Sequence, residues 1–292
     1  TGHHYLSHPY QMMQPLPSLA RISAESGSMD LLSTVLMPLQ NPVRLAEEVA
    51  TLDVITNGHV IIAPALGYRD EEYEAFGVTR EDRVRRMLEG MELMKLLWTG
   101  NEVTFDGEFT KVTGVHIGVK PVQQPHPRMW MTANGDNMVR RIARMGYVWY
   151  LNPHASFDTL ARQVEMYKAV RNEHGHGAID VLPMSRETFV AKTRQEAQDT
   201  ARPFLEAKYK TYAQWGQDKA MPGEEDFTRS FDDLSQGRFI VGDPVDVISD
   251  LTKFQNIGVT HASLRFGWPG TPKSVVEGAM RLAAEEVLPA LR

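Results

Sequence analysis

The segment 133–138 joins an expected strand, 128–133, to an expected helix, 137–145. Backbone N–H groups at a helix start carry partial positive charge and bind phosphate oxygens. Gly135 has no side chain to keep an anion away, whereas Asp136 is unfavourable unless it points outward or caps the helix. We predict a phosphate site here, with a plain capped loop as the alternative. The residues concerned are Ala133, Asn134, Gly135, Asp136, Asn137 and Met138.

Three histidines, His3, His4 and His8, lie near the beginning of the chain. An imidazole titrates near neutral pH and can transfer a proton, so His3 is a candidate acid–base group. The alternative is a frayed terminus. No cluster of carboxylates accompanies these histidines, so we expect no metal site.

A polar segment, LGYRDEEYEAFG, follows an expected strand at Val60–Ile62 and is interpreted as a loop. Its acidic run 70–72 suggests paired acid–base carboxylates, but a solvated loop that starts a helix is the favoured interpretation. Tyr68 is expected to line a pocket and is a candidate contact for both the cofactor and the substrate. Arg83 and Arg85 are candidates for a phosphate counter-charge, with ordinary exposed arginines as the alternative.

The elements that must position these residues alternate between helices and strands. Asn41 and Pro42 suit the cap and first position of a helix that runs to Asn57-Gly58. About six strands are expected in all, and their alternation with helices predicts a parallel sheet. Residues 102–127 are expected to form a hairpin or loop that interrupts the alternation of strands and helices. Residues 216–237 are expected to form an exposed insertion or a mobile lid.

Composition limits the class of protein. The chain has 292 residues, 42% of them hydrophobic, which is enough for a sizeable core in a single domain spanning 1–292. The formal net charge of −6 argues against a general nucleic-acid binder. No window contains the roughly 18 apolar residues of a membrane helix, and there is no cysteine for a disulfide or thiolate site. We expect a cytoplasmic protein without nucleic-acid or membrane partners.

Several motifs in order resemble the bacterial-luciferase-like flavin monooxygenases. They are His3-His4, NPVRLAEEVATLD, GYRDEEYEAFG, the PVQQPHPRMW lead-in to a strand, and, more weakly, IVGDPVDV and LRFGWPG. The resemblance implies a (β/α)8 barrel, usually dimeric, that holds reduced FMN or F420 at the carboxyl ends of its strands. The family's histidine pair ends its second strand. We therefore expect the first strand–helix–strand to be absent from the given chain, as in a fragment or an unusual barrel.

The resemblance also implies roles for particular residues. His3 matches the catalytic histidine beside the flavin ring. Ser33-Thr34 matches a strand bulge that often has a non-prolyl cis peptide under the ring, and Met37 packs against the ring or fills the core. Trp268, at the end of the last strand, is either a wall of the substrate pocket or simply buried.

Some positions depart from the family pattern. His59 replaces a usual Arg, and 63–65 (Ala-Pro-Ala) replaces a glycine-rich strand end. Gly2 stands where an acidic residue commonly precedes the histidine pair. These changes bear on flavin contacts near the family's fourth strand more than on the fold.

The resemblance implies a flavin-dependent monooxygenase. It would use O2 and reduced FMN from a partner flavin reductase to oxidise a small, largely apolar organic substrate. One alternative is an F420-dependent oxidoreductase that transfers hydride on the same fold. Another is a non-catalytic flavin-binding protein. A homodimer is expected in each case.

Overall fold

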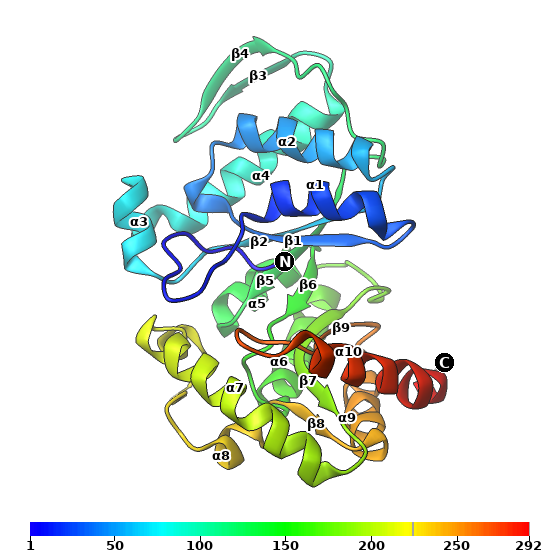
Figure 1. Ribbon diagram of the computed structural model, residues 1–292. Helices are drawn as coiled ribbons and strands as arrows, with labels where there is room; N and C mark the ends of the chain where they lie inside the picture. Colours follow the sequence, from blue (N-terminus) through cyan, green and yellow to red (C-terminus); the bar gives the residue numbers. More distant parts are fainter. Residues whose placement is uncertain (224, 292) are drawn as a thin grey trace. The chain divides into compact units, whose positions relative to one another are not determined.

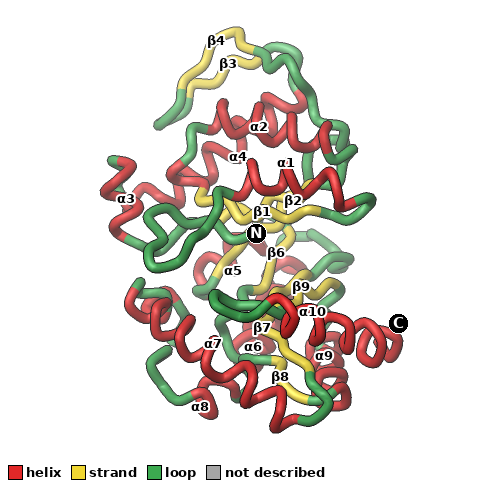
Figure 2. The backbone as a smooth tube through the Cα atoms, viewed as in Figure 1, coloured by secondary structure: helices red, strands yellow, loops and turns green. Residues whose placement is uncertain are grey.

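The computed structural model describes residues 1–223 and 225–291. The chain separates into two compact units, Thr1–Thr132 and Ala133–Arg292. Figure 1 labels their helices and strands, and Figure 2 distinguishes helices, strands and loops along the same trace.

The first unit is built on parallel strands covered by helices. Strand β1 (Leu31–Leu36) pairs with β2 (Val60–Ala65) in regular register, and β2 pairs with β5 (Arg128–Ala133). Helices α1, α2 and α4 lie together beside β1 and β2 (Figure 1). Their bounds are α1 (Pro15–Ser26), α2 (Pro42–Ile55) and α4 (Arg83–Thr99).

Shorter pieces complete this unit. Single 3-10 turns, Met37–Leu39 and Arg80–Asp82, follow β1 and precede α4. The strands β3 (Val103–Asp106) and β4 (Lys111–Val115) form the antiparallel excursion that the sequence predicts. The segment after β2 is a loop only as far as Arg69, because the helix α3 (Asp70–Phe76) follows, and the acidic run 70–72 starts this helix as predicted. Acidic side chains in the first turn of α3 favour that helix start, since they complement the helix dipole.

The start of α2 has the predicted cap. The Asn41 side chain accepts hydrogen bonds from the backbone N–H groups of Val43 and Arg44, at 3.0 and 3.1 Å. Pro42 occupies the first turn, where its missing N–H leaves nothing unpaired. At the other end Asn57 and Gly58 have positive φ values of 51° and 84° and end the helix.

Replacing Asn41 with Ala is expected to lower the free energy of unfolding by about 1 kcal/mol, because two N–H groups lose their acceptor. Replacing it with Asp is expected to preserve stability, since a carboxylate caps equally well. Urea denaturation of the three proteins measures both effects, and an Ala variant as stable as the Asp variant would contradict the assignment.

The second unit is organised around the long, buried strand β7 (Pro183–Val190). It pairs in parallel with β6 (Val148–Leu151), β8 (Ile240–Gly242) and β9 (His261–Arg265). Figure 1 shows α7 and α10 beside β7. The helices are α5 (Asp136–Arg144), α6 (Phe157–Glu173), α7 (Arg194–Gln214), α8 (Phe231–Ser235), α9 (Pro244–Asn256) and α10 (Lys273–Leu282), followed by a π turn (Ala283–Val287) and a 3-10 turn (Leu288–Leu291).

Two predictions for this unit need correction. The described strands include β8, a short parallel strand that the predicted count of about six omitted. The segment 216–237 is not exposed throughout, because its described part contains α8 and buries Met221, Phe227, Phe231 and Leu234; its role as an insertion or lid stays a prediction. Phe227, Phe231 and Leu234 have helical spacing, but the polar residues around them hid this signal in the sequence.

In the described part of the chain, no helix combines the length and the apolar character needed to cross a membrane.

Candidate functional site

In the second unit, the turn between β6 and α6 is held by side chains from several elements. The side-chain oxygen of Asn152 accepts from the backbone N–H groups of His154 and Ala155, each at 2.9 Å. The buried Arg186, from β7, donates to the carbonyls of residues 153 and 155 at 3.2 and 2.9 Å. The buried Arg238 donates to the carbonyl of His154 at 2.5 Å and pairs with Glu225 at 2.8 Å. Three consecutive carbonyls of this turn therefore bind guanidinium groups.

His154 is buried among aromatic rings. Its Nδ1 lies 3.2 Å from the hydroxyl of Tyr209, and its ring is 5.3 Å from that of Tyr212 and 6.1 Å from that of Phe227. Burial lowers the pKa of His154 well below the ordinary value, and the nearby Lys208 and other cations lower it further. His154 is therefore neutral at physiological pH.

A buried carboxylate, Glu187, lies on β7 and binds three side chains. Lys208, on α7, forms a short ion pair with Oε1, and the indole N–H of Trp268 donates to Oε2 at 2.6 Å. Arg265, at the end of β9, lies 3.5 Å from Oε1.

The ionisation of this group follows from its neighbours. Burial raises the pKa of Glu187, but Lys208 and Arg265 outweigh burial and hold it below the ordinary value. Burial lowers the pKa of Lys208 to about 8, with Glu187 opposing the change. Both groups are thus charged at neutral pH. Trp268 is 6% exposed, and its indole N–H is bound to Glu187. Both observations favour the interpretation that Trp268 is a buried structural residue over the interpretation that it forms a wall of the substrate pocket.

The 133–138 turn has the geometry of a helix start. Gly135 is the N-cap of α5, and its carbonyl accepts from the N–H groups of Met138 and Val139. The Asp136 carboxylate accepts from Arg162 at 2.7 and 3.0 Å and from Gln163 at 2.9 Å. Gln163 also donates to the carbonyl of Asn134 at 2.8 Å. Hydrogen bonding from Arg162 lowers the pKa of Asp136, so the carboxylate stays charged but paired with α6.

His3 is ordered in the first unit. It is 6% exposed, its Nδ1 accepts from the backbone N–H of Leu36 at 3.2 Å, and its Nε2 lies 2.9 Å from the carbonyl oxygen of the Gln14 side chain. Because the backbone N–H must be the donor, the imidazole proton is on Nε2 and donates to Gln14. Burial lowers the pKa of His3 to about 4, so the prediction that it titrates near neutral pH is wrong.

Glu72 is the unexpected carboxylate of this unit. It is fully buried, not solvated as predicted, and one oxygen accepts from the backbone N–H of Tyr5 at 2.9 Å and lies 3.1 Å from the Nδ1 of His4. The rings of His4 and Tyr68 meet edge to face at 5.5 Å. Tyr68 is half-buried next to the carboxyl end of β2.

Ser33 and Thr34 form part of a regular strand. The β1–β2 register runs without a bulge from Leu31 to Leu36, and in the described chain the cis peptides precede Pro9 and Pro125. The predicted bulge with a cis peptide at Ser33–Thr34 is therefore wrong for this structure. Ser33 is fully buried and Thr34 partly exposed.

Met37, Arg83 and Arg85 fit structural roles. The Met37 methyl group lies 3.4 Å from where a Cβ at Gly90 of α4 would be, which supports core filling. Arg83 donates to the carbonyl of Arg80 at 2.7 Å. Arg85 forms short ion pairs with Asp82 and Glu108, so its charge is already balanced and it does not fit a phosphate counter-charge.

The sequence analysis missed the charged residues of the second unit. Arg186 and Glu187 interrupt the expected strand 184–191, and two adjacent charges in a buried strand are a signal that each needs a buried partner. Lys208 follows buried positions of α7 at 197, 201 and 205, so it lies near the buried face. No comparable signal marks His154 or Arg238.

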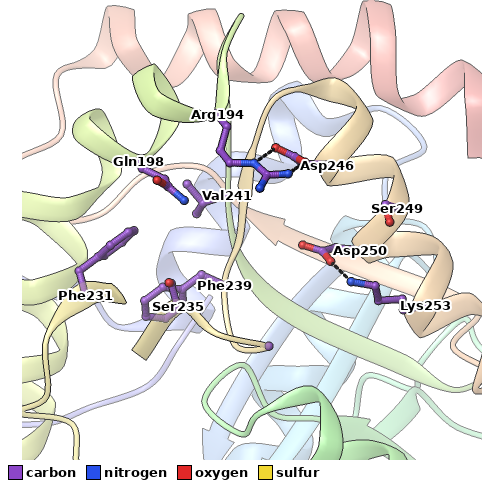
Figure 3. Close-up of a pocket in the computed structure, with 11 residues that line it drawn as sticks. Arg194, Gln198, Phe231, Ser235, Phe239, Val241, Asp246, Ser249, Asp250 and Lys253 are labelled. Carbon is purple, nitrogen blue, oxygen red and sulfur yellow. Dashed lines mark hydrogen bonds and ion pairs between the residues drawn. The ribbon is translucent and has the colours of Figure 1, made fainter. Parts of the chain in front are cut away.

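A cavity of about 300 Å³ lies between α7, α8, β8 and α9 (Figure 3). Its charged side chains pair with one another: Arg194 binds Asp246, and Lys253 binds Asp250 at 2.7 Å. A neighbouring cavity of about 510 Å³ shares Lys253 and Asp250. Because these charges balance, the cavities offer a weaker case for ligand chemistry than the Glu187 group. Among the described residues, no group of three or more His, Asp or Glu side chains is placed to hold a metal ion.

Two curated relatives align with this chain. An uncharacterized protein of Mycobacterium tuberculosis is 32% identical over 142 residues, covering 48% of this chain and 50% of that protein. The FMNH2-dependent dimethylsulfone monooxygenase of Pseudomonas putida is 24% identical over 171 residues, covering 56% of this chain and 47% of that protein. The chain thus matches about half the length of each relative.

Two solved structures share the fold. The oxygenating constituent of 3,6-diketocamphane monooxygenase from Pseudomonas putida, in complex with FMN, superposes with a TM-score of 0.83 at 17% identity, covering 99% of this chain and 87% of that one. An F420-dependent secondary alcohol dehydrogenase gives a TM-score of 0.79 at 17% identity, covering 100% and 89%.

These likenesses confirm the predicted α/β fold of the luciferase-like, TIM-barrel type; closure of the ring and a single domain stay predictions. The profile of the luciferase-like monooxygenases matches residues 1–261. The chain belongs to the luciferase-like monooxygenase family, and the relatives described above by an activity are oxidoreductases.

Proposed function

We propose that this protein is a flavin-dependent monooxygenase that uses reduced FMN and O2 to oxidise a small organic substrate. The observation that carries the proposal is the start of α5. Arg162 and Gln163 bind the Asp136 carboxylate, so the one acidic group of the turn is paired with α6. A Cβ at Gly135 would have no atom within 4 Å, so there is open space beside the N-cap. Both features suit a phosphate bound by the first N–H groups of the helix.

The residues of the turn would hold the phosphate end of the flavin. Reduced FMN supplies the electrons that activate O2, and the protein orients the cofactor and excludes water. The relative in Pseudomonas putida is named for its use of FMNH2, which supports FMN as the cofactor. A separate flavin reductase would supply it, and the active protein is proposed to be a cytoplasmic homodimer.

His3 would act as a neutral hydrogen-bonding group. Its Nδ1 is fixed by the N–H of Leu36, and its Nε2–H is directed to the Gln14 amide oxygen. With a pKa of about 4, it holds its proton on Nε2 throughout the physiological range and does not gain a second one. We propose that this N–H orients a polar atom of the flavin or of bound oxygen by exchanging its bond with Gln14. Ser33, Thr34 and Tyr68 remain candidates for the surrounding contacts.

An F420-dependent hydride transfer is the second candidate, because the F420-dependent alcohol dehydrogenase shares the fold over the whole chain. A non-catalytic flavin-binding protein is the third. Three assays separate them: O2 uptake with FMNH2 and either dimethylsulfone or decanal, anaerobic oxidation of F420H2, and flavin binding by fluorescence. We expect substrate-coupled O2 uptake with FMNH2. Turnover only with F420H2, or binding without turnover, would replace the proposal with the second or third candidate.

Replacing Gly135 with Asp is expected to weaken FMN binding at least about tenfold, equivalent to about 1.4 kcal/mol. The new carboxylate would cap the helix, occupy the N–H groups and repel the phosphate, while the helix itself keeps or gains stability. Gly135→Asn adds a side chain of the same size without charge and should weaken binding less. Riboflavin, which lacks the phosphate, should bind all three proteins alike; an equal loss for riboflavin would contradict a phosphate site at this turn.

A further inference from the structure

The strands β7 and β9 share a polar face in the second unit. Paired residues of parallel neighbours project to the same side of a sheet, and the register pairs Ser185 with Ser263 and Glu187 with Arg265. A sheet face that is buried normally carries apolar side chains. Ser185 and Glu187 on β7 are fully buried and require partners, whereas Ser263 and Arg265 on β9 are exposed or partly exposed.

The partners within the protein do not balance the charges. Glu187 is bound by Lys208 through a short ion pair and by Trp268 at 2.6 Å, so its two oxygens are occupied. Among the described residues, the guanidinium of Arg265 makes one polar contact, at 3.5 Å to Glu187. Two cations thus face one carboxylate, and the side chain of Arg265 is 35% exposed, so a ligand can reach it.

Other groups nearby agree with an excess of positive charge. The pKa of His154 is lowered by burial and then by Lys208, Arg265, Arg238 and Arg186, which shows that these cations act on one buried region. Glu225 neutralises Arg238 at 2.8 Å, whereas Arg186 donates to two carbonyl oxygens and lies over the ring of Phe254, without an ion pair among the described residues. The hydroxyl of Ser185 is buried and has no hydrogen-bond partner among the described residues. A bound oxyanion would supply both the missing negative charge and an acceptor.

We propose that Arg265 binds the carboxylate group of the organic substrate, with its guanidinium positioned by Glu187, which Lys208 in turn holds. This inference rests on the proposed function and narrows its substrate class from largely apolar compounds to those that carry a carboxylate. Arginine suits the role because its planar fork of N–H groups binds both oxygens of a carboxylate. The position fits as well, because Arg265 ends β9 and barrel proteins bind ligands at the carboxyl ends of their strands.

The experiment measures binding of small probe anions to the whole protein. Benzoate and hexanoate are titrated against wild type by calorimetry, with benzamide and hexanamide as neutral probes of the same shape. Wild type is expected to bind each carboxylate at least about tenfold more tightly than its amide. Arg265→Gln should remove this preference, and Arg265→Lys, which keeps the charge but loses the fork, should retain part of it.

Two controls make the result decisive. Arg281→Gln removes an exposed arginine of α10 and should leave the preference unchanged; an equal loss there would show that only net charge matters and would overturn the proposal. Unfolding curves of the ligand-free variants test whether Arg265→Gln is folded. If it is not, wild type is compared with Arg265→Lys instead. Equal binding of acids and amides to wild type also overturns the proposal.

Flavin binding by the same preparations separates the two possible sources of an anion. If Arg265→Gln weakens FMN but not riboflavin, Arg265 serves the cofactor phosphate and the substrate assignment is wrong. If wild type binds no flavin but keeps its preference for carboxylates, the proposed function fails and the anion site stands. If flavin binds and the preference is absent, the anion site alone fails.

Discussion

Replacing Glu187 with Gln is expected to lower the free energy of unfolding by about 3–5 kcal/mol, because it removes one partner from a buried ion pair. The ammonium group of Lys208, with its side chain 7% exposed, would then be buried without a counter-charge. Guanidinium denaturation at pH 7 measures the loss. The double variant Glu187→Gln/Lys208→Met removes both charges and is expected to recover most of the stability. A single variant within about 1 kcal/mol of wild type would show that the pair contributes little.

The same variant should respond to pH in a defined direction. The pKa of Lys208 is about 8 in the folded protein, against an ordinary value of 10.5 in an unfolded chain, so the unfolded chain binds more protons between these values. Stability from this group therefore rises with pH across that window. Because Glu187→Gln lowers the folded pKa further, the difference from wild type is expected to shrink as the pH is raised from 7 to 9.

The second large effect is the loss of stability in acid caused by His3. The pKa of His3 is about 4 in the folded protein, against an ordinary value of 6.5 in an unfolded chain, so the unfolded chain takes up the proton first as the pH falls. The contribution of the neutral His3 imidazole to the free energy of unfolding is fully present above about pH 6.5. It is lost as the pH falls towards 4, by about 3 kcal/mol in total.

Comparison with His3→Asn isolates this contribution, since His154 changes stability in the same direction. The Asn side-chain oxygen retains an acceptor for the N–H of Leu36 but does not titrate. The variant is expected to be less stable than wild type at pH 7.5, and the gap should narrow by about 3 kcal/mol at pH 4. A gap that stays constant would mean that the folded protein does not hold the imidazole neutral.

Local rules predict the elements of this protein well. The Asn41-Pro42 cap, the strand 128–133 and the helix after Gly135 lie where the sequence predicts them, because each depends on neighbouring residues alone. The short strand β8 was missed because its order comes from pairing with β7, 52 positions earlier for Thr188 and Ile240. The acidic run 70–72 predicts the start of α3, but its length is not predictable because its polar sequence has no apolar stripe, although Tyr73 is buried.

The site was harder to predict than the fold. The turn at 133–138 could be proposed from strand, glycine and helix alone, yet the pairing of Asp136 with Arg162 depends on how α5 packs against α6. The Glu187 group joins β7, α7, β9 and the residue Trp268, and nothing local specifies which charges meet. The predicted pKa of His3 was wrong because a sequence does not reveal the burial that lowers it.

The two arginines that bind the β6–α6 turn have a practical consequence for redesign. Arg186 and Arg238 bind main-chain carbonyls of residues 153–155, and every amino acid has a carbonyl. Retaining both guanidiniums is therefore necessary for this turn but not sufficient, because the Asn152 side chain binds two N–H groups of the turn and His154 is buried against Tyr209. Grafting residues 152–156 into another scaffold would not transfer the shape of the turn, because Arg186, Arg238 and Tyr209 are encoded elsewhere in the gene.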